Sequence, residues 1–307
     1  MVAVVAGAAG IEDARPLLDR AERFDGSSPI SDQALLAVSQ HQRDLWLFTE
    51  QGTDNAEVTA PIAVGVLGQG EVDLVVDPRE RGRGVGSAAL GTLLEKAPDA
   101  LLAWAHGDNP AADALLAGAG FSPIRSLFRM ALDPAKLPTA NSNPYATKLP
   151  EGFTLRSFGG ADDPAEWVRV NAAAFADHPE QGRVTEADFA LMREEPWFDP
   201  HDLLLLEDAD VRLAGFTWIK TVVDSDDEAT GTETELYAIG VDPEHAGLGL
   251  GRALLDATLA RMATHSPERV TLYVDGENER AVRMYEAVGF TVDSRSRQWR
   301  RGARIGS

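Results

Sequence analysis

Two glycine-rich runs in this 307-residue chain have residue types and spacing suited to binding a phosphate group. They are Arg81–Gly86 and Ala246–Gly251, in which glycine alternates with other residues. Each run follows an apolar, strand-like segment and opens a helix-like one. Glycine lets the backbone approach a ligand closely, and the free N–H groups at a helix start attract an anion. We therefore predict two pyrophosphate cradles, with glycine-rich turns that bind no ligand as the alternative.

Two common nucleotide motifs do not fit these runs. The third glycine of the dinucleotide-binding pattern G-x-G-x-x-G would fall on Ser87 in one run and on Arg252 in the other. Neither run continues into the Gly-Lys-Ser/Thr of a Walker motif. The predicted phosphate sites are therefore of another type.

Two side chains near the second run suit general acid–base chemistry. Glu235 begins the apolar segment before the run, and Tyr285 follows Asn278 and Ala281 at the spacing of one helix face. A carboxylate accepts a proton from an amine, and a tyrosine hydroxyl donates one to a leaving group. The alternatives are a solvated acid at the end of an acidic stretch and a buried tyrosine in an amphipathic helix.

The two halves of the chain repeat each other. Pro243 lies 165 positions after Pro78, and Phe290 lies 169 positions after Phe121, with matching neighbours in each case. Nearly constant offsets indicate a duplicated domain. The first half has Gly70 where the second has Glu235, and Leu116 where the second has Tyr285. Glu71 is one position away, which in a regular strand turns its side chain to the opposite face. We therefore expect the chemistry in the second half.

The halves are joined by a segment with four prolines in seventeen residues, 134–150. Such a segment forms neither a helix nor an inner strand. We predict a non-catalytic domain over 1–133, a linker over 134–150 and a catalytic domain over 151–307. Hydrophobic periodicity predicts a series of helices and strands. In the first half we expect helices at Ile11–Phe24 and Ser31–Val38. In the second half we expect strands at Phe153–Ser157, Leu203–Leu206, Leu213–Ile219, Glu235–Val241, Val270–Val274 and beyond Phe290; helices at Pro164–Ala176, Thr185–Arg193, Gly249–Ala263 and Asn278–Val288; and an exposed hairpin loop at Asp224–Thr234.

Composition excludes several classes of function. The formal net charge is −21, which makes nucleic acid and anionic membranes poor partners. There is no cysteine, so disulfides, thiol nucleophiles and cysteine-ligated metals are excluded. The six histidines are scattered, and we predict no metal site. The apolar stretch at the start of the sequence lacks the layout of a signal peptide or a membrane span. We expect a cytoplasmic monomer.

The glycine runs with the following Asn, Ala, Tyr and Gly-Phe resemble the GNAT acetyltransferase superfamily. Its loop has the form Gln/Arg-x-x-Gly-x-Gly/Ala, which Arg81, Gly84 and Gly86 match, whereas the second run has Ala246 in the first position. The resemblance implies an α/β fold of two tandem acyl-CoA-binding domains, each with a mixed sheet splayed between its fourth and fifth strands, and acetyl-CoA as acetyl donor. The implied cofactor-binding residues are Leu74, Val75, Val76, Gly82, Arg83, Gly84, Val85, Gly86, Ser87, Ile239, Gly240, Val241, Ala246, Gly247, Leu248, Gly249, Leu250, Gly251, Arg252, Asn278, Glu279, Arg280, Ala281, Val282 and Arg283.

A closer resemblance spans the whole chain. The fragments Trp104–Gly107, Asn171–Phe175, His178–Gly182, Trp197–Pro200 and Leu272–Val274 are similar to tandem GNAT enzymes that acetylate the cysteinyl amine of Cys-GlcN-Ins (desacetylmycothiol), the last step of mycothiol biosynthesis. This implies catalysis by Glu235 as base and Tyr285 as acid. The implied substrate contacts are Asp32, Glu180, Lys220, Glu235 and Tyr273. Asp32 stands where those enzymes commonly have Glu, which keeps the charge and shortens the reach.

Two other functions remain open at this stage. One is a GNAT enzyme acting on another amine, such as an aminoglycoside, a polyamine or a protein N-terminus. The other is a sensor that binds acyl-CoA in both halves without turnover. Glu235 and Tyr285 argue against the sensor, because a protein that only binds has no need of them. Asp32, Lys220 and Tyr273, each taken alone, fit a surface or core role equally well.

Overall fold

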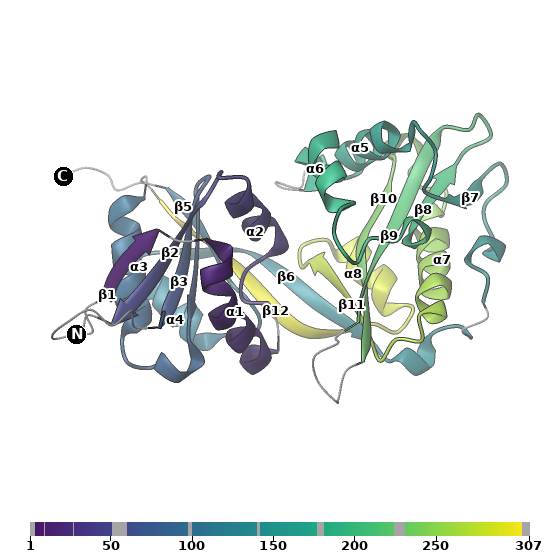
Figure 1. The fold of residues 1–307 in the computed structure, drawn as a ribbon. Coiled ribbons are helices and arrows are strands. Elements are labelled where there is room, and N and C mark those ends of the chain that lie inside the picture. The colour runs from purple at the N-terminus through teal and green to yellow at the C-terminus, as the bar shows by residue number, and fades with distance from the viewer. Residues whose placement is uncertain are drawn as a thin grey trace. The chain divides into compact units, whose positions relative to one another are not determined.

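The structure is a computed structural model of the chain, and it describes residues 4–8, 10–26, 28–50, 60–97, 100–139, 142–176, 181–223 and 231–302. The chain divides into two compact units. The first comprises residues 1–128, 275–277 and 294–307, and the second comprises 129–274 and 278–293. Figure 1 labels the helices and strands of both units.

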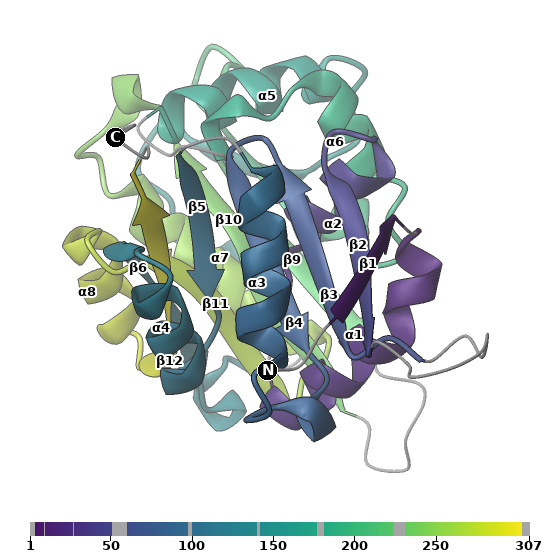
Figure 2. The same cartoon turned by 90° about the vertical axis from the view of Figure 1, so that its left-hand side faces the viewer.

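The first unit is a mixed sheet with helices on both faces. Its strand order is β1-β2-β3-β4-β5-β12, antiparallel except for the parallel pair β4–β5. Figure 2 shows α3 and α4 in front of this sheet. Its elements are β1 (Val4–Ala8), α1 (Ile11–Asp25), α2 (Asp32–Ser39), β2 (Asp44–Glu50), β3 (Ala63–Gly68), β4 (Glu71–Val76), α3 (Val85–Lys96), β5 (Leu101–Ala105), α4 (Pro110–Gly118) and the later part of β12 (Thr291–Arg301).

The second unit repeats this architecture. Its strand order is β6-β11-β10-β9-β8-β7, with β7 to β10 antiparallel and β10–β11 parallel. In Figure 1, α5 and α6 lie on one side of these strands and α7 on the other. Its elements are the later part of β6 (Ser122–Leu132), β7 (Thr154–Ser157), α5 (Asp163–Ala174), α6 (Glu186–Met192), β8 (Leu203–Glu207), β9 (Leu213–Val223), β10 (Thr232–Val241), α7 (Leu250–Thr264), β11 (Arg269–Asp275) and α8 (Glu279–Glu286).

The predicted fold class is confirmed. Both halves run strand, two helices, three strands, helix, strand, helix, strand along the chain. The predicted helices and strands are present, with shifts at their ends. The capping box expected of Thr185 and Asp188 is formed, since each side chain accepts from the other residue's backbone N–H. These local choices agree with the fold, as expected of a sequence with a single native structure.

One loop prediction needs correction. We expected an exposed loop over Asp224–Thr234, but β10 already begins at Thr232. Thr232 pairs with Val223, and Thr234 pairs with Thr221 of β9. The β-branched threonines favour a strand, and the partner strand β9 extends past the predicted Ile219 to meet them. Residues 224–230 lie outside the described part of the chain.

The last strand of each half is exchanged. β12 follows the second half in sequence, yet its residues 297–301 pair with β5 of the first unit, as Trp299 with Ala103. β6 follows the first half, and it neighbours β11 in the second unit. The compact units thus contain a different set of residues from the predicted domains 1–133 and 151–307. Those domains follow the repeat in the sequence and remain a prediction. Their boundary in space depends on which sheet each last strand joins.

Each sheet has a hydrophobic core on both faces. In the first unit, α1 packs with Val64, Val66 and Val75 on one face, whereas α3 packs with other residues, Phe48 and Val72 among them, on the opposite face. In the second unit, α5 and α6 cover Phe216 and Trp218, and α7 covers Ile239 and Val241. The face under α5 and α6 therefore corresponds, through the repeat, to the face under α1 and α2.

Candidate active site

A splay opens in each sheet between its two parallel strands. In the second unit, β10 and β11 are paired only from Glu233 to Leu236, while β10 continues to Val241 beside β9. In the first unit, the register of β4 and β5 covers only Glu71 and Val72. The divergence lies where the resemblance predicted it, between the fourth and fifth strands of each half. It leaves backbone groups of β10 available to a ligand, including those of Ile239–Val241.

The two glycine runs begin helices, as predicted. Gly247 and Gly249 have φ of 83° and 81°, and α7 starts directly afterwards without a side-chain cap. Gly82 and Gly84, with φ of 75° and 86°, precede α3 in the same way. A Cβ built on any of these four glycines meets no other atom within 4 Å. The left-handed backbone, not crowding, therefore requires glycine at these positions, and the N–H groups at the starts of α3 and α7 have no side-chain cap.

A buried aspartate holds each loop in place. Asp242 precedes the second loop, accepts a hydrogen bond from the backbone N–H of Glu244 at 3.1 Å and pairs with Arg169 at 2.7 Å. Asp77 makes the same contacts in the first half, with Arg79 N at 3.0 Å and Arg20 at 2.8 Å. Burial opposes their ionisation, but these bonds outweigh it and lower the pKa of both carboxyls. The repeated Val-Asp-Pro thus anchors the loops.

The loops differ in charge. Arg81 in the first loop binds Asp25 through both terminal nitrogens, at 2.6 and 2.7 Å. Arg83 pairs with Glu50 at 3.1 Å and also with Glu80. The corresponding residues of the second loop are Ala246 and the exposed Leu248. Because carboxylates already neutralise the first loop's arginines, the predicted phosphate binding at both loops would depend chiefly on backbone N–H groups.

Glu235 lies on β10 between two polar neighbours. In the sheet register it is directly opposite Lys220 of β9 and Thr271 of β11. Directly opposed residues of neighbouring strands project from the same face, about 5 Å apart at Cβ. Tyr273 follows two residues after Thr271 on that face and is 42% exposed. The structure therefore brings together three of the predicted substrate contacts, Lys220, Glu235 and Tyr273.

The neighbouring acid Glu233 has a different role. Its carboxylate binds Arg129 at 3.2 Å and Arg269 at 3.0 Å, and it accepts a hydrogen bond from the hydroxyl of Thr271 at 3.0 Å. Two guanidinium groups and a hydroxyl therefore occupy this carboxylate, which gives it a structural role. Of the two acids on this face of β10, Glu235 is the better candidate for a general base.

A β-bulge follows Glu235. The register of β10 against β9 shifts between Leu236 and Ala238, so that Tyr237 is the extra residue. The shift changes which face later residues occupy, so Glu235 and Ala238 both lie under α5 and α6. Bulges often occur beside active sites, where they redirect a side chain.

The bulge corrects one sequence-based expectation. We expected Glu71 to face away from the side that Glu235 occupies, but β4 pairs with β3 without a bulge. Glu71 therefore lies on the α1–α2 face, together with Asp73, and both carboxylates bind Arg43, at 3.1 and 2.6 Å. Gly70 sits at the hairpin turn with φ of 79°. The first half thus has acids on the corresponding face, but a buried arginine holds them.

Tyr285 is 5% exposed, and its ring packs edge-on against Phe290 with centroids 6.0 Å apart. Burial raises the pKa of its hydroxyl. The carbonyl of Tyr285 accepts from Phe290 N at 3.2 Å, as that of Leu116 accepts from Phe121 N at 3.0 Å. These matching helix ends show that Leu116 occupies the position of Tyr285 in the repeat. A raised pKa suits a hydrogen-bond donor to a thiolate more than a full proton donor.

The asparagine of the spacing Asn278, Ala281, Tyr285 has a structural task. Its side chain precedes α8 and accepts from Ala281 N at 3.1 Å, which caps the helix. Asn109 caps α4 in the same way, from Ala112 N at 3.0 Å. Asn278 therefore lies outside the helix, and the spacing reflects capping as well as any ligand contact. Arg283, one of the predicted cofactor residues, pairs with Glu279 at 2.9 Å.

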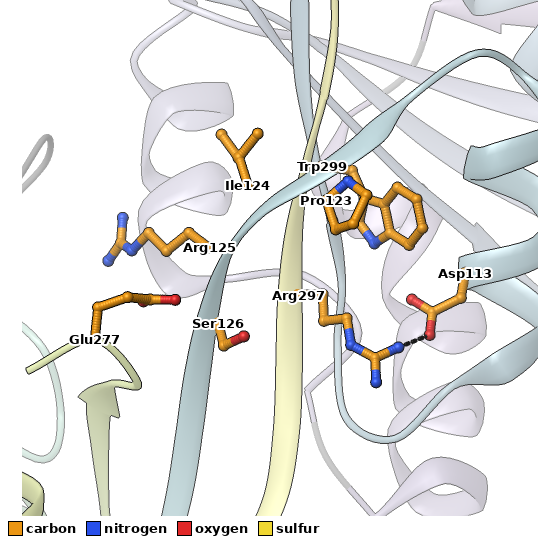
Figure 3. A pocket seen from close by; sticks show the side chains of 8 residues that line it. All are labelled: Asp113, Pro123, Ile124, Arg125, Ser126, Glu277, Arg297 and Trp299. Atoms are coloured by element: carbon orange, nitrogen blue, oxygen red, sulfur yellow. Dashed lines mark hydrogen bonds and ion pairs between the residues drawn. The ribbon is translucent and has the colours of Figure 1, made fainter. Parts of the chain in front are cut away.

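The remaining predicted residues are less informative. Asp32 is the first residue of α2 in the first unit, and Glu180 lies outside the described residues. A cavity of about 360 Å³ in the first unit contains no residue that we predicted for a site (Figure 3). It is lined by Asp113, Pro123, Ile124, Arg125, Ser126, Glu277, Arg297 and Trp299. Its two arginines, Arg125 and Arg297, pair with Asp275 and Asp113.

Comparison with known proteins defines the class. The model of the Acetyltransferase (GNAT) family matches residues 30–121 and 167–290, one segment in each half. The chain belongs to the GNAT acetyltransferase family. It is similar to the mycothiol acetyltransferases of Clavibacter michiganensis, with 41% identity over 92% of this chain and 89% of the relative, and of Frankia alni, with 40% identity over 96% and 93%. The closer resemblance seen in the sequence is thereby confirmed.

Solved structures support the fold. A tandem GNAT protein from the clavulanic acid biosynthesis pathway has a TM-score of 0.70 and 18% identity, and covers 99% of this chain and 100% of its own. A GCN5-related N-acetyltransferase from Sphaerobacter thermophilus has a TM-score of 0.67 and 23% identity, with coverage of 99% and 97%. At these identities the likeness concerns the fold alone.

Proposed function

We propose that the chain transfers the acetyl group of acetyl-CoA to the cysteinyl amine of Cys-GlcN-Ins, in mycothiol biosynthesis, and that the second half performs the reaction. The names of the relatives support the pathway. One structural observation supports the location: the uncapped start of α7 and its left-handed glycines adjoin the splayed strand that bears Glu235. In the first half, the corresponding strand position is a glycine.

Acetyl-CoA, when bound, supplies a thioester whose carbonyl carbon accepts the amine. The open space above Gly247 and Gly249 fits its pyrophosphate, and the N–H groups of Leu250 and Gly251 would hold it. The splayed backbone at Ile239–Val241 would bind the pantetheine arm and offer an N–H to the oxyanion. The predicted cofactor residues of α8, including Arg280, would lie along the nucleotide. Leu74–Val76 and the first loop would hold a second molecule in the first half.

The chain's own proton transfers follow from the site. An α-amino group has a pKa of about 7.7–8.0, so roughly a tenth is neutral at pH 7. Glu235 accepts the proton that nitrogen loses as it attacks, directly or through water, a contribution of about 10²–10⁴-fold. Tyr285 hydrogen-bonds to the departing sulfur. Lys220 and Tyr273 bind hydroxyl and amine groups of the acceptor, with Asp32 and Glu180 as further contacts.

The test is acetylation of a defined acceptor. The protein is incubated with acetyl-CoA and Cys-GlcN-Ins, and the product is analysed by mass spectrometry for one added acetyl group. The matched control is the glucosaminyl-inositol without its cysteinyl residue, which lacks the cysteinyl amine and carries the free amine of the sugar instead. An aminoglycoside, a polyamine and a peptide N-terminus are assayed in parallel. Faster acetylation of one of these amines would assign another acceptor, and acetyl-CoA binding without turnover would indicate a sensor.

The setting is also part of the proposal. We expect a cytoplasmic monomer that works without a metal, nucleic acid or membrane. Among the described residues, none of the helices combines the length and apolar character of a membrane span. Within the same ranges, no group of three or more histidines and acids is arranged to hold a metal ion. Gel filtration and light scattering measure the oligomeric state.

A further inference from the structure

Three aromatic side chains form a cluster beside the proposed base. Trp197 and Tyr237 have ring centroids 5.2 Å apart, and both pack on Trp218 at 5.5 and 5.4 Å. Trp218 is fully buried, whereas Trp197 and Tyr237 are half-buried and form the rim. Trp197 belongs to the fragment Trp197–Pro200, which carried the resemblance but has no part in the proposed chemistry.

The rim of this cluster holds a positive charge. The ammonium of Lys220 lies 5.3 Å from the ring centroid of Trp197 and 6.0 Å from that of Tyr237. At such distances the negative ring faces attract a cation. Lys220 follows Trp218 by two residues on β9, so both side chains project from the same face. Two aromatic rings therefore restrict where this flexible side chain places its charge.

The charge is next to Glu235. Lys220 and Glu235 are directly opposite each other in the β9–β10 register. Tyr237 and Ala238 are adjacent in sequence, and in a regular strand their side chains would point to opposite faces. Because of the bulge, both lie on the face of Lys220 and Glu235. From β11, Thr271 and Tyr273 face Glu235. Of the other charged groups on this face, Glu233 is already neutralised by Arg129 and Arg269. Lys220 is thus the cation assigned to Glu235.

We propose that Trp197 and Tyr237 are positioning residues that hold the Lys220 ammonium beside Glu235, where it keeps the carboxylate ionised and ready to accept a proton. This inference rests on the proposed function of Glu235 as base. An adjacent positive charge stabilises a carboxylate and lowers its pKa. Lys220 then serves the base as well as the acceptor, a role that a substrate contact alone does not have.

The test is the pH dependence of turnover for three variants, at saturating acetyl-CoA. Lys220→Met should move the acid limb of kcat to higher pH by about one unit, because the carboxylate loses its cation. Trp197→Leu should move it in the same direction by less, and Trp197→Phe should stay close to wild type because a ring remains. Arg269→Met, which removes a cation from Glu233, is the matched control and should leave the limb in place.

The outcomes separate this proposal from the one on which it rests. If Glu235→Gln keeps wild-type turnover, Glu235 is not the base and the proposed mechanism fails. If Glu235→Gln loses turnover but Lys220→Met only raises KM for the acceptor, with the acid limb unmoved, the positioning role is wrong. If Trp197→Leu and Trp197→Phe behave alike, the aromatic ring does not hold the charge. Melting temperatures confirm that each variant is folded.

Discussion

The two halves of this acetyltransferase share an order of elements and a glycine loop, but they differ in one strand. β4 of the first half is regular, whereas β10 of the second has a bulge at Tyr237. The regular strand places Glu71 and Asp73 on one face, where the buried Arg43 binds both. The bulged strand places Glu235 on the corresponding face, opposite Lys220. The duplicated fold thus uses carboxylates structurally in one half, and we propose that it uses Glu235 for chemistry in the other.

The comparison teaches that the partner decides what an acid does. A carboxylate bound to a buried guanidinium, as Asp73 is to Arg43, has a structural role in the fold. Glu235 lies opposite the half-buried Lys220 on the splayed strand, and we propose that it acts as the base. Merely finding an acid at a repeat position is therefore insufficient evidence for catalysis. The variants that follow test this contrast.

The largest effect is expected in the first half. Arg43→Met leaves the carboxylate of Asp73, in a residue 6% exposed, without its cation. Breaking a buried ion pair by removing one partner costs about 3–5 kcal/mol of stability. We expect a correspondingly lower denaturant midpoint for the first unit. Hydrogen exchange of the backbone amides of β3 and β4 measures this loss of stability. Unchanged protection of these strands would show that Arg43 does not hold the acids.

The next effect concerns the second half. Glu235→Gln keeps the shape of the side chain but removes the proton acceptor, and kcat should fall by on the order of 10² or more. Thiol release measures the rate, and calorimetry should show an unchanged affinity for acetyl-CoA. Glu233→Gln is the matched control on the same strand. An equal loss in both variants would point to electrostatics of the strand rather than to one base.

Tyr285→Phe should have a smaller effect on turnover. It removes a hydroxyl but keeps the ring that packs on Phe290. A hydrogen bond to a charged group is worth about 1.5–3 kcal/mol, so kcat should fall about 10- to 100-fold with acetyl-CoA affinity retained. The reverse change Leu116→Tyr in the first half should create no activity, since Gly70 supplies no base. A lower melting temperature with normal kcat would make Tyr285 a core residue only.

The smallest effect separates the two loops. Gly249→Val forces a β-branched residue into a left-handed backbone, at a cost of about 1–2 kcal/mol, and should weaken acetyl-CoA binding about 5- to 30-fold. Gly84→Val makes the same change in the first loop and should leave turnover unchanged. Calorimetry and steady-state rates distinguish the two. A loss of turnover in Gly84→Val alone would give the first loop a direct part in catalysis.

Much of this site could be predicted from the sequence, because the signals were local. The glycine loops, the capping box at Thr185 and the equivalence of Leu116 and Tyr285 all depend on short spacings. The bulge could not be predicted, since Tyr237 fits a regular strand as well as a bulged one. For the same reason, our prediction that Glu71 faces away from the side occupied by Glu235 was wrong. The role of Asn278 as a helix cap could have been recognised from the repeat. Asn109 stands at the equivalent position in the first half, where Leu116 replaces the tyrosine, so the asparagine has a purpose without it.

Pairing between distant strands was also beyond the sequence. The repeat predicts that each half completes its own sheet, but β5 pairs with β12. Hydrophobic periodicity predicts that a segment is a strand but not which strand it pairs with, and both β6 and β12 would fit beside either β5 or β11. The identity of the partner is a property of the whole chain.

The strand exchange has a consequence for the order of folding during synthesis. Trp104 of β5 cannot pair with Gln298 of β12 until the ribosome has added about two hundred further residues. Until then the nascent first unit exposes an unpaired strand edge, a feature that invites association with other chains. The pairing also closes a very long loop, which slows folding. Each unit therefore takes its last strand from the other half of the sequence, so neither half completes its sheet on its own.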